Sequence, residues 1–389
     1  MRKKIYLLLL TISVCFLNIN QAKAQKKWYK GSTHIHTTYS DGKLIPADVV
    51  ATYKADGYSF IFITDEDHIT PTDTLSDSLF LCFNGEEAIL DQHFSCLNIV
   101  RDVSPLSFQQ VIDSTYVQGG IAVLNHPLRG THEVYAAVIL EMKNLNYIEI
   151  FNGKSEKDGY HDTQMLWDSI LSAGKLFYGV AADDFHETKH LGKGWIMVAS
   201  DTLQKDSVVN ALKQGNFYSS TGAYISKIDV SDSLITIIAM DANTISFIGD
   251  NRTTLQTTNG DTSTYTITGN EGYIRAEVLG LNNKKAWTQP LFWNKTYEGN
   301  PYLPSKDVTV ENNWDIYPNP ASDFIYINAD NITNKTFFTL YDIRGEIVGR
   351  GTITTQPEAY INLTNIQPGL YFLNLSDKNH FNSYRIIRK

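Results

Sequence analysis

Residues 31–42 read Gly-Ser-Thr-His-Ile-His-Thr-Thr-Tyr-Ser-Asp-Gly, and the rest of the chain can be interpreted outward from this stretch. Only one residue separates His34 from His36, so both side chains leave the same face of an extended backbone. Two imidazoles on one face can share a metal ion, and Asp41 adds an oxygen ligand or a partner that orients a ligand. Taken alone, this spacing is equally compatible with two ordinary histidines.

From residue 28 to about residue 200, short apolar runs alternate with helical patterns, which is typical of a βα-repeating fold. Pro46 suits the first turn of the first helix, and Gly57 suits its end. Further helical patterns occur near residues 107–117, 134–145 and 163–173, and the apolar runs cover residues 58–63, 80–83, 121–124, 147–151 and 176–180. The carboxyl ends of parallel strands converge on one mouth of a barrel, so the residues at the ends of these runs should become neighbours there.

Residues that can bind a metal stand at the ends of most of these runs. Nine of the ten histidines lie between positions 34 and 190, and Asp184 and His186 repeat the spacing of the opening pair. Glu87 could bridge two ions through its two oxygens, while His93 and His126 complete the coordination of one of them. Imidazole and carboxylate ligands without thiolate suit Zn²⁺, Mn²⁺ or Fe²⁺. Two or three such ions would activate a bridging water and clamp the oxygens of an in-line displacement.

Five ordered motifs within residues 28–200 resemble those of a known family: His-x-His with Ser-Asp-Gly (34–42), Thr-Asp (64–65), Gly-x-Glu (85–87), His-Pro (126–127) and Asp-x-His (184–186). Together they resemble the polymerase and histidinol phosphatase (PHP) metallohydrolase family. The resemblance implies an α/β fold with a distorted seven-stranded β/α barrel, two or three divalent metal ions and cleavage of phosphoesters. It also implies the metal ligands His34, His36, Glu87, Asp184 and His186, with His93 and His126 on the ion that Glu87 bridges.

One position departs from the family pattern. The family usually has histidine directly after Thr-Asp, where this chain has Glu66. A carboxylate can replace an imidazole on the same ion, and His68 lies two residues further along the same face. The number of bound ions therefore depends on Glu66.

The expected reaction gives roles to these residues. A hydroxide that bridges the ions would attack phosphorus, and the predicted catalytic residues around it are His34, His36 and Asp184. The remaining ion would stabilise the non-bridging oxygens, held by Asp41, Glu66 or His186. Arg129 and Lys193 are predicted to bind the substrate, because their charge lies near the ligand-bearing strand ends. Three other histidines are expected at the surface or against the substrate, namely His132, His161 and His190.

Residues 223–294 alternate short β runs with turns, which predicts a β-rich accessory domain after a barrel that spans residues 25–222. Its ending at residues 286–290, Ala-Trp-Thr-Gln-Pro, is similar to the segment after the barrel in a PHP branch that includes ester and carbamate hydrolases. Packing against the barrel and carbohydrate binding are both open roles for this domain. Residues 295–313 have the composition of a linker. Residues 314–389 predict a small β-sandwich, and their ordered segments resemble the type IX secretion sorting domain of Bacteroidetes.

The amino terminus has the pattern of a signal peptide, with three basic residues at positions 2–4, an apolar run at 5–17 and a small-x-small site at 22–24. The apolar run is too short to span a bilayer comfortably, and Cys15 lies inside it, so cleavage is preferred over anchoring or lipidation. Removal of residues 1–24 takes away four positive charges and no acid, so the net charge changes from −9 to −13. Such a chain repels nucleic acid. Export permits a disulfide between Cys82 and Cys96, and two free thiols are equally compatible with the sequence.

Three functions are compatible with these features. The first is a secreted metal-dependent phosphoesterase that acts on a small phosphomonoester or phosphodiester and is exported by the type IX machinery. The second uses the same metals to hydrolyse a carboxylic ester or an amide, as carbamate hydrolases do. The third is a non-catalytic surface protein that binds a ligand at a degenerate metal site, which Glu66 motivates.

Overall fold

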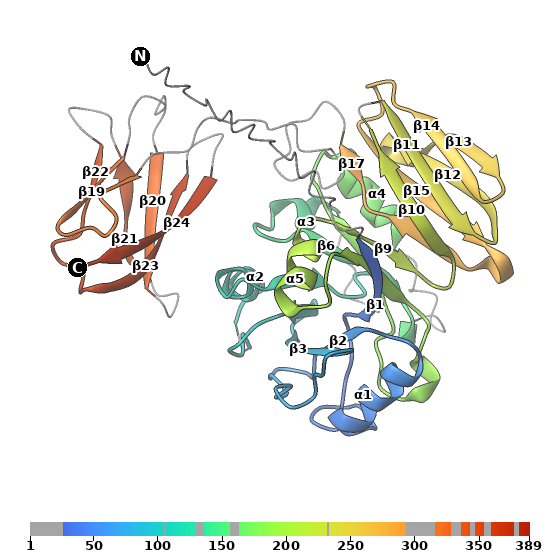
Figure 1. Cartoon of the computed structure of the whole chain (residues 1–389), viewed down its shortest axis with the longest axis horizontal. Helices are drawn as coiled ribbons and strands as arrows, with labels where there is room; N and C mark the ends of the chain where they lie inside the picture. The colour runs from blue at the N-terminus through green and yellow to red at the C-terminus, as the bar shows by residue number, and fades with distance from the viewer. Residues whose placement is uncertain are drawn as a thin grey trace, which may run out of the picture.

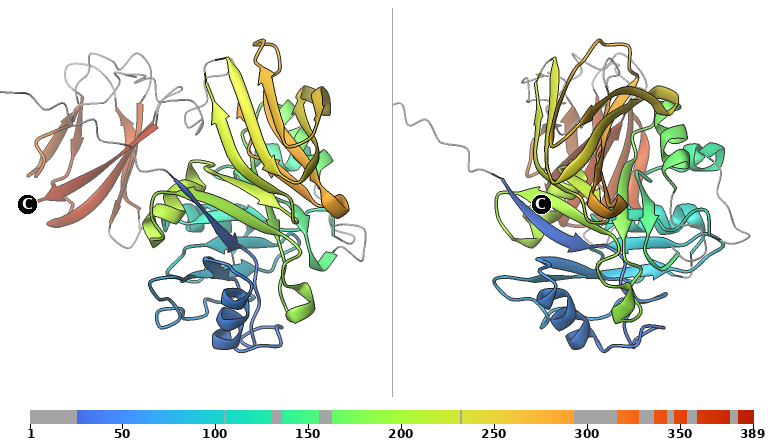
Figure 2. Two further views of the ribbon diagram at one scale, coloured as in Figure 1. Left: turned by 45° about the vertical axis from the view of Figure 1, so that its right-hand side comes forward. Right: turned by 90° about the vertical axis from the view of Figure 1, so that its right-hand side faces the viewer.

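The computed structural model describes residues 26–104, 106–129, 136–155, 163–231, 233–292, 316–327, 336–342, 347–353, 359–376 and 381–389. The predicted signal peptide and linker, together with His132 and His161, lie outside these ranges. Figure 1 shows a lobe that contains β1–β9 and α1–α5, the accessory strands β10–β17 and a separate lobe of C-terminal strands. Figure 2 shows the yellow and orange accessory strands standing beside the blue and green lobe.

The α-helices in the described ranges all precede residue 214 and agree with the predicted pattern. They are α1 (Pro46–Ala55), α2 (Phe108–Val117), α3 (Ala136–Glu141), α4 (Gln164–Ser172) and α5 (Lys205–Lys213), and short 3-10 turns occur at η2 (Thr188–His190), η3 (Asp250–Arg252) and η4 (Leu281–Asn283). Pro46 opens α1, whose buried side chains include Val49 and Tyr53. Gly57 comes after α1 with a φ of +76°, a conformation that favours glycine.

A single large sheet runs through the first lobe and into the accessory strands, in the order β13-β12-β15-β16-β9-β8-β1-β2-β3-β4-β5-β6-β7, with β17 paired to β15. The strands of the first lobe are β1 (Lys27–Ser32), β2 (Phe60–Ile63), β3 (Leu81–Ala88), β4 (Phe94–Leu97), β5 (Ile121–Leu124), β6 (Tyr147–Asn152), β7 (Tyr178–Ala182), β8 (Trp195–Ser200) and β9 (Phe217–Ser220). The predicted α/β fold is confirmed. β3 is longer than predicted, so Glu87 lies within the strand and not after it.

Strands β1, β2, β3, β5, β6 and β7 run in the same direction. The pairs β1–β2, β2–β3, β5–β6 and β6–β7 are parallel, while β4 is antiparallel to both of its neighbours. The chain that leaves β1 meets the chain that leaves β7 at a parallel bridge between Ile35 and Phe185, where His36 N donates to Phe185 O at 2.8 Å. The carboxyl ends of the parallel strands are thereby drawn to one place. Closure as a seven-stranded barrel stays a prediction.

Apolar side chains fill the space beneath this mouth. Strand β2 is completely buried, and Phe62 stacks on Phe83 with ring centroids 4.5 Å apart. Helix α5 packs Val208 and Leu212 into the same cluster. The strands that carry polar residues at their ends are therefore anchored by a continuous apolar core.

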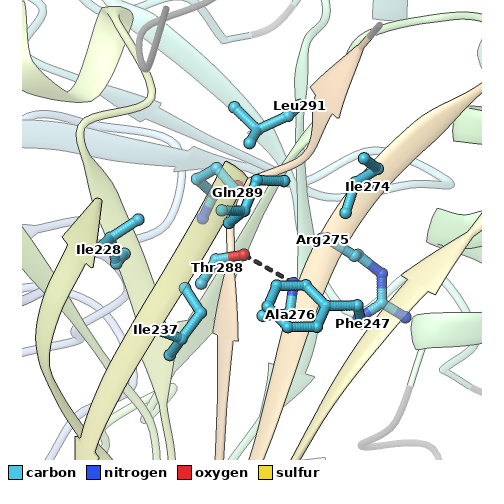
Figure 3. Close-up of a pocket in the computed structure, with 10 residues that line it drawn as sticks. Ile228, Ile237, Phe247, Ile274, Arg275, Ala276, Thr288, Gln289 and Leu291 are labelled. Carbon is cyan, nitrogen blue, oxygen red and sulfur yellow. Dashed lines mark hydrogen bonds between the residues drawn. The ribbon is translucent and has the colours of Figure 1, made fainter. Parts of the chain in front are cut away.

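The accessory strands form two layers, of which one continues the large sheet. They are β10 (Tyr224–Val230), β11 (Leu234–Met240), β12 (Ala242–Gly249), β13 (Thr253–Asn259), β14 (Thr262–Thr266), β15 (Tyr273–Gly280), β16 (Lys285–Thr288) and β17 (Leu291–Phe292). The second layer is β10-β11-β14, and a small apolar pocket between the layers is lined by Ile237, Phe247 and Leu291 (Figure 3). The predicted domain border at residue 222 falls between β9 and β10, yet the antiparallel ladder between β9 and β16 carries one sheet across it.

A buried cluster of charges joins the accessory strands to α4. Arg275 Nε and Nη2 donate to the two oxygens of Asp168 at 2.8 and 2.7 Å, and the guanidinium lies 4.8 Å from the centroid of the Trp167 ring. Arg252 Nη1 donates to Asp168 at 2.8 Å, and Nη2 of Arg275 lies 2.7 Å from Glu277. We call these four residues, Asp168, Arg252, Arg275 and Glu277, the α4 clamp. Figure 3 shows Arg275 at the edge of the pocket.

The C-terminal strands form two small sheets, β18-β19-β22 and β21-β20-β23-β24. Their bounds are β18 (Ile316–Tyr317), β19 (Phe324–Ile327), β20 (Thr336–Asp342), β21 (Ile347–Ile353), β22 (Tyr360–Asn362), β23 (Gly369–Ser376) and β24 (Phe381–Arg388). Side chains from both sheets share one apolar cluster, including Ile325, Leu340 and Leu373. This arrangement agrees with the predicted small β-sandwich.

Candidate metal centre

The opening His-x-His pair lies on the chain that leaves β1. Ile35 is completely buried and pairs with Phe185, so His34 and His36 both point to the other side. The two Nε2 atoms lie 3.0 Å apart, and neither residue has exposed surface. The predicted sharing of one face is confirmed.

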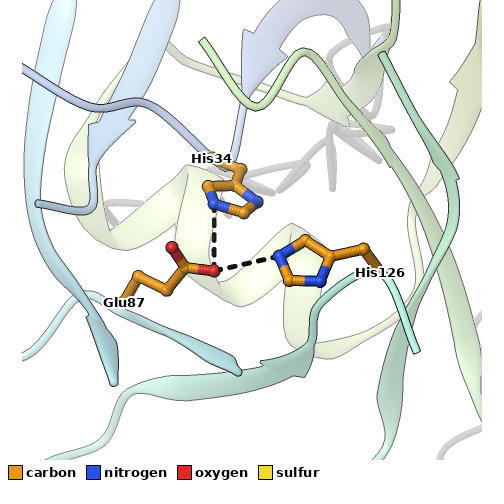
Figure 4. A group of neighbouring side chains, drawn as sticks. All are labelled: His34, Glu87 and His126. Carbon is orange, nitrogen blue, oxygen red and sulfur yellow. Dashed lines mark hydrogen bonds and ion pairs between the residues drawn. The ribbon is translucent and has the colours of Figure 1, made fainter. Parts of the chain in front are cut away.

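Further strand ends bring ligand atoms to this pair. Glu87 Oε1 lies 3.2 Å from His34 Nε2 and 3.3 Å from His126 Nε2, and Figure 4 shows both imidazoles directed at this oxygen. Asp184 Oδ1 lies 3.6 Å from Nε2 of both His34 and His36. These atoms come from the ends of β1, β3, β5 and β7, as expected for parallel strands whose carboxyl ends converge.

The protonation of His34 leaves an acceptor pointing into the cluster. His34 Nδ1 lies 2.7 Å from Glu149 Oε1, so a neutral imidazole donates its Nδ1 hydrogen to this carboxylate. The Nε2 atom then carries a lone pair, yet its neighbours are the oxygens of Glu87 and Asp184 and a second imidazole nitrogen. Acceptors that face one another need a proton or a metal cation between them. A carboxylate behind a ligating histidine is also the usual way to fix its tautomer for a metal.

The described residues contain four groups whose ligand atoms all lie within 4.8 Å of one another. The groups are His34, Glu87 and His126; His34, His36 and Asp184; His36, Asp41 and His186; and His36, Glu66 and Glu87. Each group offers only nitrogen and carboxylate oxygen donors, which suit Zn²⁺, Mn²⁺ and Fe²⁺. Because the groups share members, the ligand set fits a cluster of divalent ions.

The charges of the cluster are strongly coupled. Burial disfavours the imidazolium of His34, but the carboxylates of Glu87, Asp184 and Glu149 outweigh burial and raise its pKa well above the ordinary value. Without a bound ion, a proton on Nε2 therefore supplies the positive charge among these carboxylates, and a metal ion would have to displace it. Burial also disfavours the carboxylate of Glu87, but His34 and His126 hold its pKa well below the usual range. Burial and His36 lower the pKa of His186 to about 4. His186 is therefore neutral near pH 7, the form that binds a metal.

The backbone is strained at two ligand positions. His126 has a φ of +26° and Asp184 a φ of +50°, which are uncommon for residues with a side chain. Such conformations cost on the order of 1–3 kcal/mol each and concentrate at functional sites. Next to Asp184, the buried Asp183 accepts the N–H of Gly194 at 3.0 Å and the Tyr53 hydroxyl at 2.9 Å. These contacts hold the strained turn in place.

Asp65, at the end of β2, fixes the loop after the histidine pair. Its oxygens accept Thr37 N at 2.6 Å, Thr37 Oγ1 at 2.7 Å and Ser40 Oγ at 2.8 Å. The loop then presents Asp41, whose Oδ1 lies 2.9 Å from His186 Nε2 and 3.4 Å from His36 Nδ1. Asp41 is thus held beside two ligands although its side chain is 47% exposed.

The other predicted ligands also lie at or next to the cluster. The backbone of Glu66 forms a parallel β-bridge with Glu87, and its side chain belongs to the same ligand group as Glu87 and His36. His93 Nδ1 lies 3.3 Å from Glu87 Oε1, but His93 is in none of the four groups found in the described ranges. His68 places its Nδ1 2.8 Å from the backbone oxygen of Glu66 and is likewise outside these groups. The ligand roles of these residues remain predictions.

The two predicted substrate-binding cations lie in different surroundings. Arg129 is exposed, and the backbone N–H of Lys193 donates to Asp183 Oδ1 at 2.7 Å. Their roles also remain predictions. The structure instead places Lys154, just after β6, with its Nζ 2.6 Å from His186 Nε2. Lys154 follows closely after a predicted strand end, as the predicted ligands do, and this position could have identified it from the sequence.

Three further polar residues were missed by the sequence analysis. Glu149 orients His34 and also accepts the backbone N–H of His126 at 2.7 Å. Asn152 donates to Glu149 at 3.0 Å and to Asp184 at 3.2 Å. Asn125 donates to Glu87 Oε1 at 2.8 Å, and its own side-chain oxygen is buried without a partner. A carboxylate inside the apolar run at 147–151 was the signal that could have found Glu149.

Cys82 and Cys96 are both buried free thiols. Burial raises the pKa of each to about 12, so neither is a thiolate near neutral pH. The disulfide that the sequence left open is absent between these two residues.

Solved structures that align with this chain include metal-dependent phosphoesterase-like proteins and an amidohydrolase. A two-domain protein from Bacteroides vulgatus, which contains a predicted PHP-like metal-dependent phosphoesterase, aligns over 68% of this chain and 96% of its own, with 16% identity and a TM-score of 0.43. A protein from Bifidobacterium adolescentis proposed to be a metal-dependent phosphoesterase aligns over 41% and 88%, with 13% identity and a TM-score of 0.34. An amidohydrolase from Chromobacterium violaceum with bound sulfate aligns over 40% and 87%, with 15% identity and a TM-score of 0.32. No curated protein matches the chain.

The C-terminal unit is the part of the chain that matches a family model. Residues 315–389 match the secretion system C-terminal sorting domain, which confirms the sorting domain predicted for residues 314–389. A sorting domain of this kind engages a secretion machinery and indicates export to the cell surface or the medium. Within the described ranges, every helix is too short or too polar to cross a membrane.

Proposed function

We propose that this chain is an exported metal-dependent hydrolase with a PHP-type barrel, and that it cleaves a phosphoester. The observation that carries the proposal is the set of acceptor atoms around His34 Nε2. Imidazole nitrogens and carboxylate oxygens from several strand ends face one another at 3.0–3.6 Å, an arrangement that divalent ions would complete. The predicted signal peptide and the matched sorting domain would place this activity outside the cytoplasm.

Each residue of the cluster has a task in this function. His34, His36, Glu87, His126, Asp184 and His186 would hold the ions, with Asp41, Glu66 and His93 completing their shells. Bound divalent ions would activate water and offset the negative charge that develops on the substrate. Glu149 keeps His34 in the tautomer that offers Nε2, and Asn152 holds Glu149 and Asp184 in position. The number of ions, from two to three, is left to elemental analysis.

A phosphoester is preferred over a carboxylic ester or amide because of charge. Lys154 adds a cation at the mouth, beside the residues that would hold the divalent ions. A phosphate group carries negative charge in its ground state, whereas a carboxylic ester or amide is neutral. The local field therefore favours the anionic substrate, although the net charge of the whole chain is negative.

The test is a panel of substrates on full-chain protein reconstituted with Zn²⁺ or Mn²⁺. We expect turnover of p-nitrophenyl phosphate or bis-p-nitrophenyl phosphate and little turnover of p-nitrophenyl acetate. Faster hydrolysis of the acetate would replace the proposal with an ester or amide hydrolase. Protein that retains less than one transition metal ion per chain and hydrolyses none of the three would be a non-catalytic binding protein instead.

A further inference from the structure

Lys154 is a cation that lies against the ligand cluster and has no role in the sequence-based predictions. Its Nζ lies 2.6 Å from His186 Nε2 and 4.0 Å from Asp184 Oδ1. Its side chain is 28% exposed, so it is partly buried and partly open to solvent. Lys154 therefore stands between the ligands and the solvent.

The loop that carries Lys154 is held at a fixed place. Asn152 accepts the N–H of Ser155 at 3.0 Å, while Gly153 N donates to Ala182 O at 2.9 Å. A Cβ on Gly153 would lie 2.4 Å from the Cβ of Lys193, so only glycine allows this close approach. The same Asn152 side chain also binds Asp184, at 3.2 Å. The backbone of Lys154 is thus built into the support of the cluster.

The Nε2 atom of His186 has one lone pair. Either the Lys154 ammonium or a metal ion could take it. His186 Nδ1 lies 3.0 Å from the backbone oxygen of Asp184, so Nδ1 carries the hydrogen and Nε2 is the acceptor. Nε2 accepts from Lys154, and the same residue belongs to the ligand group with His36 and Asp41. If His186 held an ion, its lone pair would no longer be available to Lys154. The Lys154 ammonium would then lie at the mouth without this acceptor, next to a second positive charge.

We propose that Lys154 binds the anionic group of the substrate, and that this group is the terminal phosphate of a phosphomonoester. The inference rests on the proposed function, because it takes the cluster to be a metal centre. Two neighbouring cations repel each other, and an anion placed between them turns that repulsion into two attractions. A terminal phosphate has more negative charge and one more free oxygen than a diester, so it can bind the ions and Lys154 at once.

Other cations at this end of the molecule are less suited to the task. Lys43 and Lys189 both pair with Glu187, on the outside of the cluster. Arg129 is exposed. Lys154 combines direct contact with a ligand, partial burial and a fixed backbone.

The experiment measures the binding of inorganic phosphate to full-chain protein reconstituted with Zn²⁺, by calorimetry, so that turnover is not required. The variants are Lys154→Met, Lys154→Arg and, as a matched control, Lys189→Met. We expect Lys154→Met to raise the dissociation constant of phosphate about ten- to hundredfold, the usual worth of a charge-assisted hydrogen bond. Lys154→Arg should recover most of the affinity, and Lys189→Met should bind phosphate as the parent does. Metal content per chain is measured on every sample.

Two results would overturn the inference. One is equal phosphate affinity in the parent and Lys154→Met at equal metal content. The other is an additional metal ion in Lys154→Met, because the ammonium would then occupy a metal position and not a substrate position. If the methionine variant does not fold, Lys154→Gln is measured instead. Unchanged phosphate binding in Lys154→Gln would then contradict the inference.

The inference can fail separately from the proposed function. A parent that hydrolyses phosphomonoesters but binds phosphate without regard to residue 154 contradicts this inference alone. If the parent hydrolyses none of the substrates but Lys154→Met still binds phosphate more weakly than the parent does, only the proposed function is contradicted.

Discussion

Two buried clusters of charged side chains lie in this chain, and they are completed in different ways. In the α4 clamp, Asp168 accepts from both Arg275 and Arg252, and Glu277 lies 2.7 Å from Arg275. Two carboxylates are thus matched by two guanidinium groups. Burial alone would lower the pKa of Arg275, but Asp168 and Glu277 raise it above its ordinary value, so the clamp stays charged.

The candidate metal centre has no such internal balance. Glu87 and Asp184 meet imidazole nitrogens, of which His34 Nε2 is an acceptor when the residue is neutral. The cation that the structure supplies is Lys154, at the edge of the cluster. The difference teaches that burial and charge do not by themselves mark a functional site. A cluster closed by its own residues is structural, whereas one that leaves acceptors facing one another invites a ligand.

The largest expected effect is the loss of activity when a residue of the candidate metal centre is replaced. His34→Ala and Asp184→Ala should each reduce phosphoester hydrolysis to the detection limit, because each removes an atom that belongs to a ligand group. Stopped assays on reconstituted protein, with circular dichroism to verify folding, provide the measurement. Asp229→Ala, an exposed position on β10, is the control that should keep full activity. A folded His34→Ala protein as active as the parent would refute the metal centre.

The second effect concerns the contribution of the α4 clamp to the free energy of unfolding. Asp168→Ala leaves Arg275 buried without its main partner and should lower the free energy of unfolding by about 3–5 kcal/mol. Replacing both residues, as Asp168→Leu with Arg275→Met, should recover much of the loss, because no unpaired charge is left buried. Urea denaturation of the full chain gives these values. The comparison between the clusters would break if Asp168→Ala changed stability no more than the exposed Asp229→Ala does.

A smaller effect, on metal affinity, is expected when Glu149, which orients His34, is replaced. Glu149→Gln keeps the shape of the side chain but weakens its hold on His34, and should reduce metal affinity about ten- to hundredfold. Competition with a chelator of known affinity measures the change. Unaltered metal binding in Glu149→Gln would mean that Glu149 serves the fold and not the metal site.

The smallest expected effect is on stability, at a carboxylate that is satisfied by hydrogen-bond donors and not by a cation. Glu271 is buried on the loop before β15, where it accepts Tyr265 Oη at 2.9 Å, Thr268 N at 2.6 Å and Gly269 N at 2.8 Å. Burial would raise the pKa of Glu271, but these donors lower it below the ordinary 4.5. Glu271→Gln places an amide donor against such an N–H and should cost about 1–2 kcal/mol at pH 7.

The sign of the pH dependence is set by the lowered pKa of Glu271. The folded state binds this proton less readily than the unfolded state, so the contribution to stability is present above pH 4.5 and is lost as the pH falls through the folded pKa. The difference between the parent and Glu271→Gln should therefore shrink in acid. Urea titrations at pH 7 and at pH 4 measure it. A difference that grows as the pH falls would contradict the assignment.

Much of the site could be predicted because ligand positions obey a simple periodicity. The spacing of His34 and His36 fixed their common face, and the apolar runs located the strand ends that supply Asp184 and His126. Glu149 escaped because it lies within an apolar run, and its purpose depends on the distant His34. Lys154 escaped because its position depends on how Gly153 packs against Lys193.

Sheet architecture was less accessible to sequence patterns. The antiparallel direction of β4 leaves no signature in its four buried residues. The ladder between β9 and β16 joins strands more than sixty residues apart, for example Ala286 with Ser220. Local propensity predicts that such strands exist but does not select their partners.

The ladder between β9 and β16 also covers a strand edge that would otherwise be open to pairing with other chains. Without the accessory strands, β9 would be the edge of the large sheet and would present a row of unpaired N–H and C=O groups to other molecules. β16 covers that edge with backbone of the same chain. An exported protein meets crowded surfaces while it matures, and here the strand that covers the edge of the first lobe is encoded in the accessory domain.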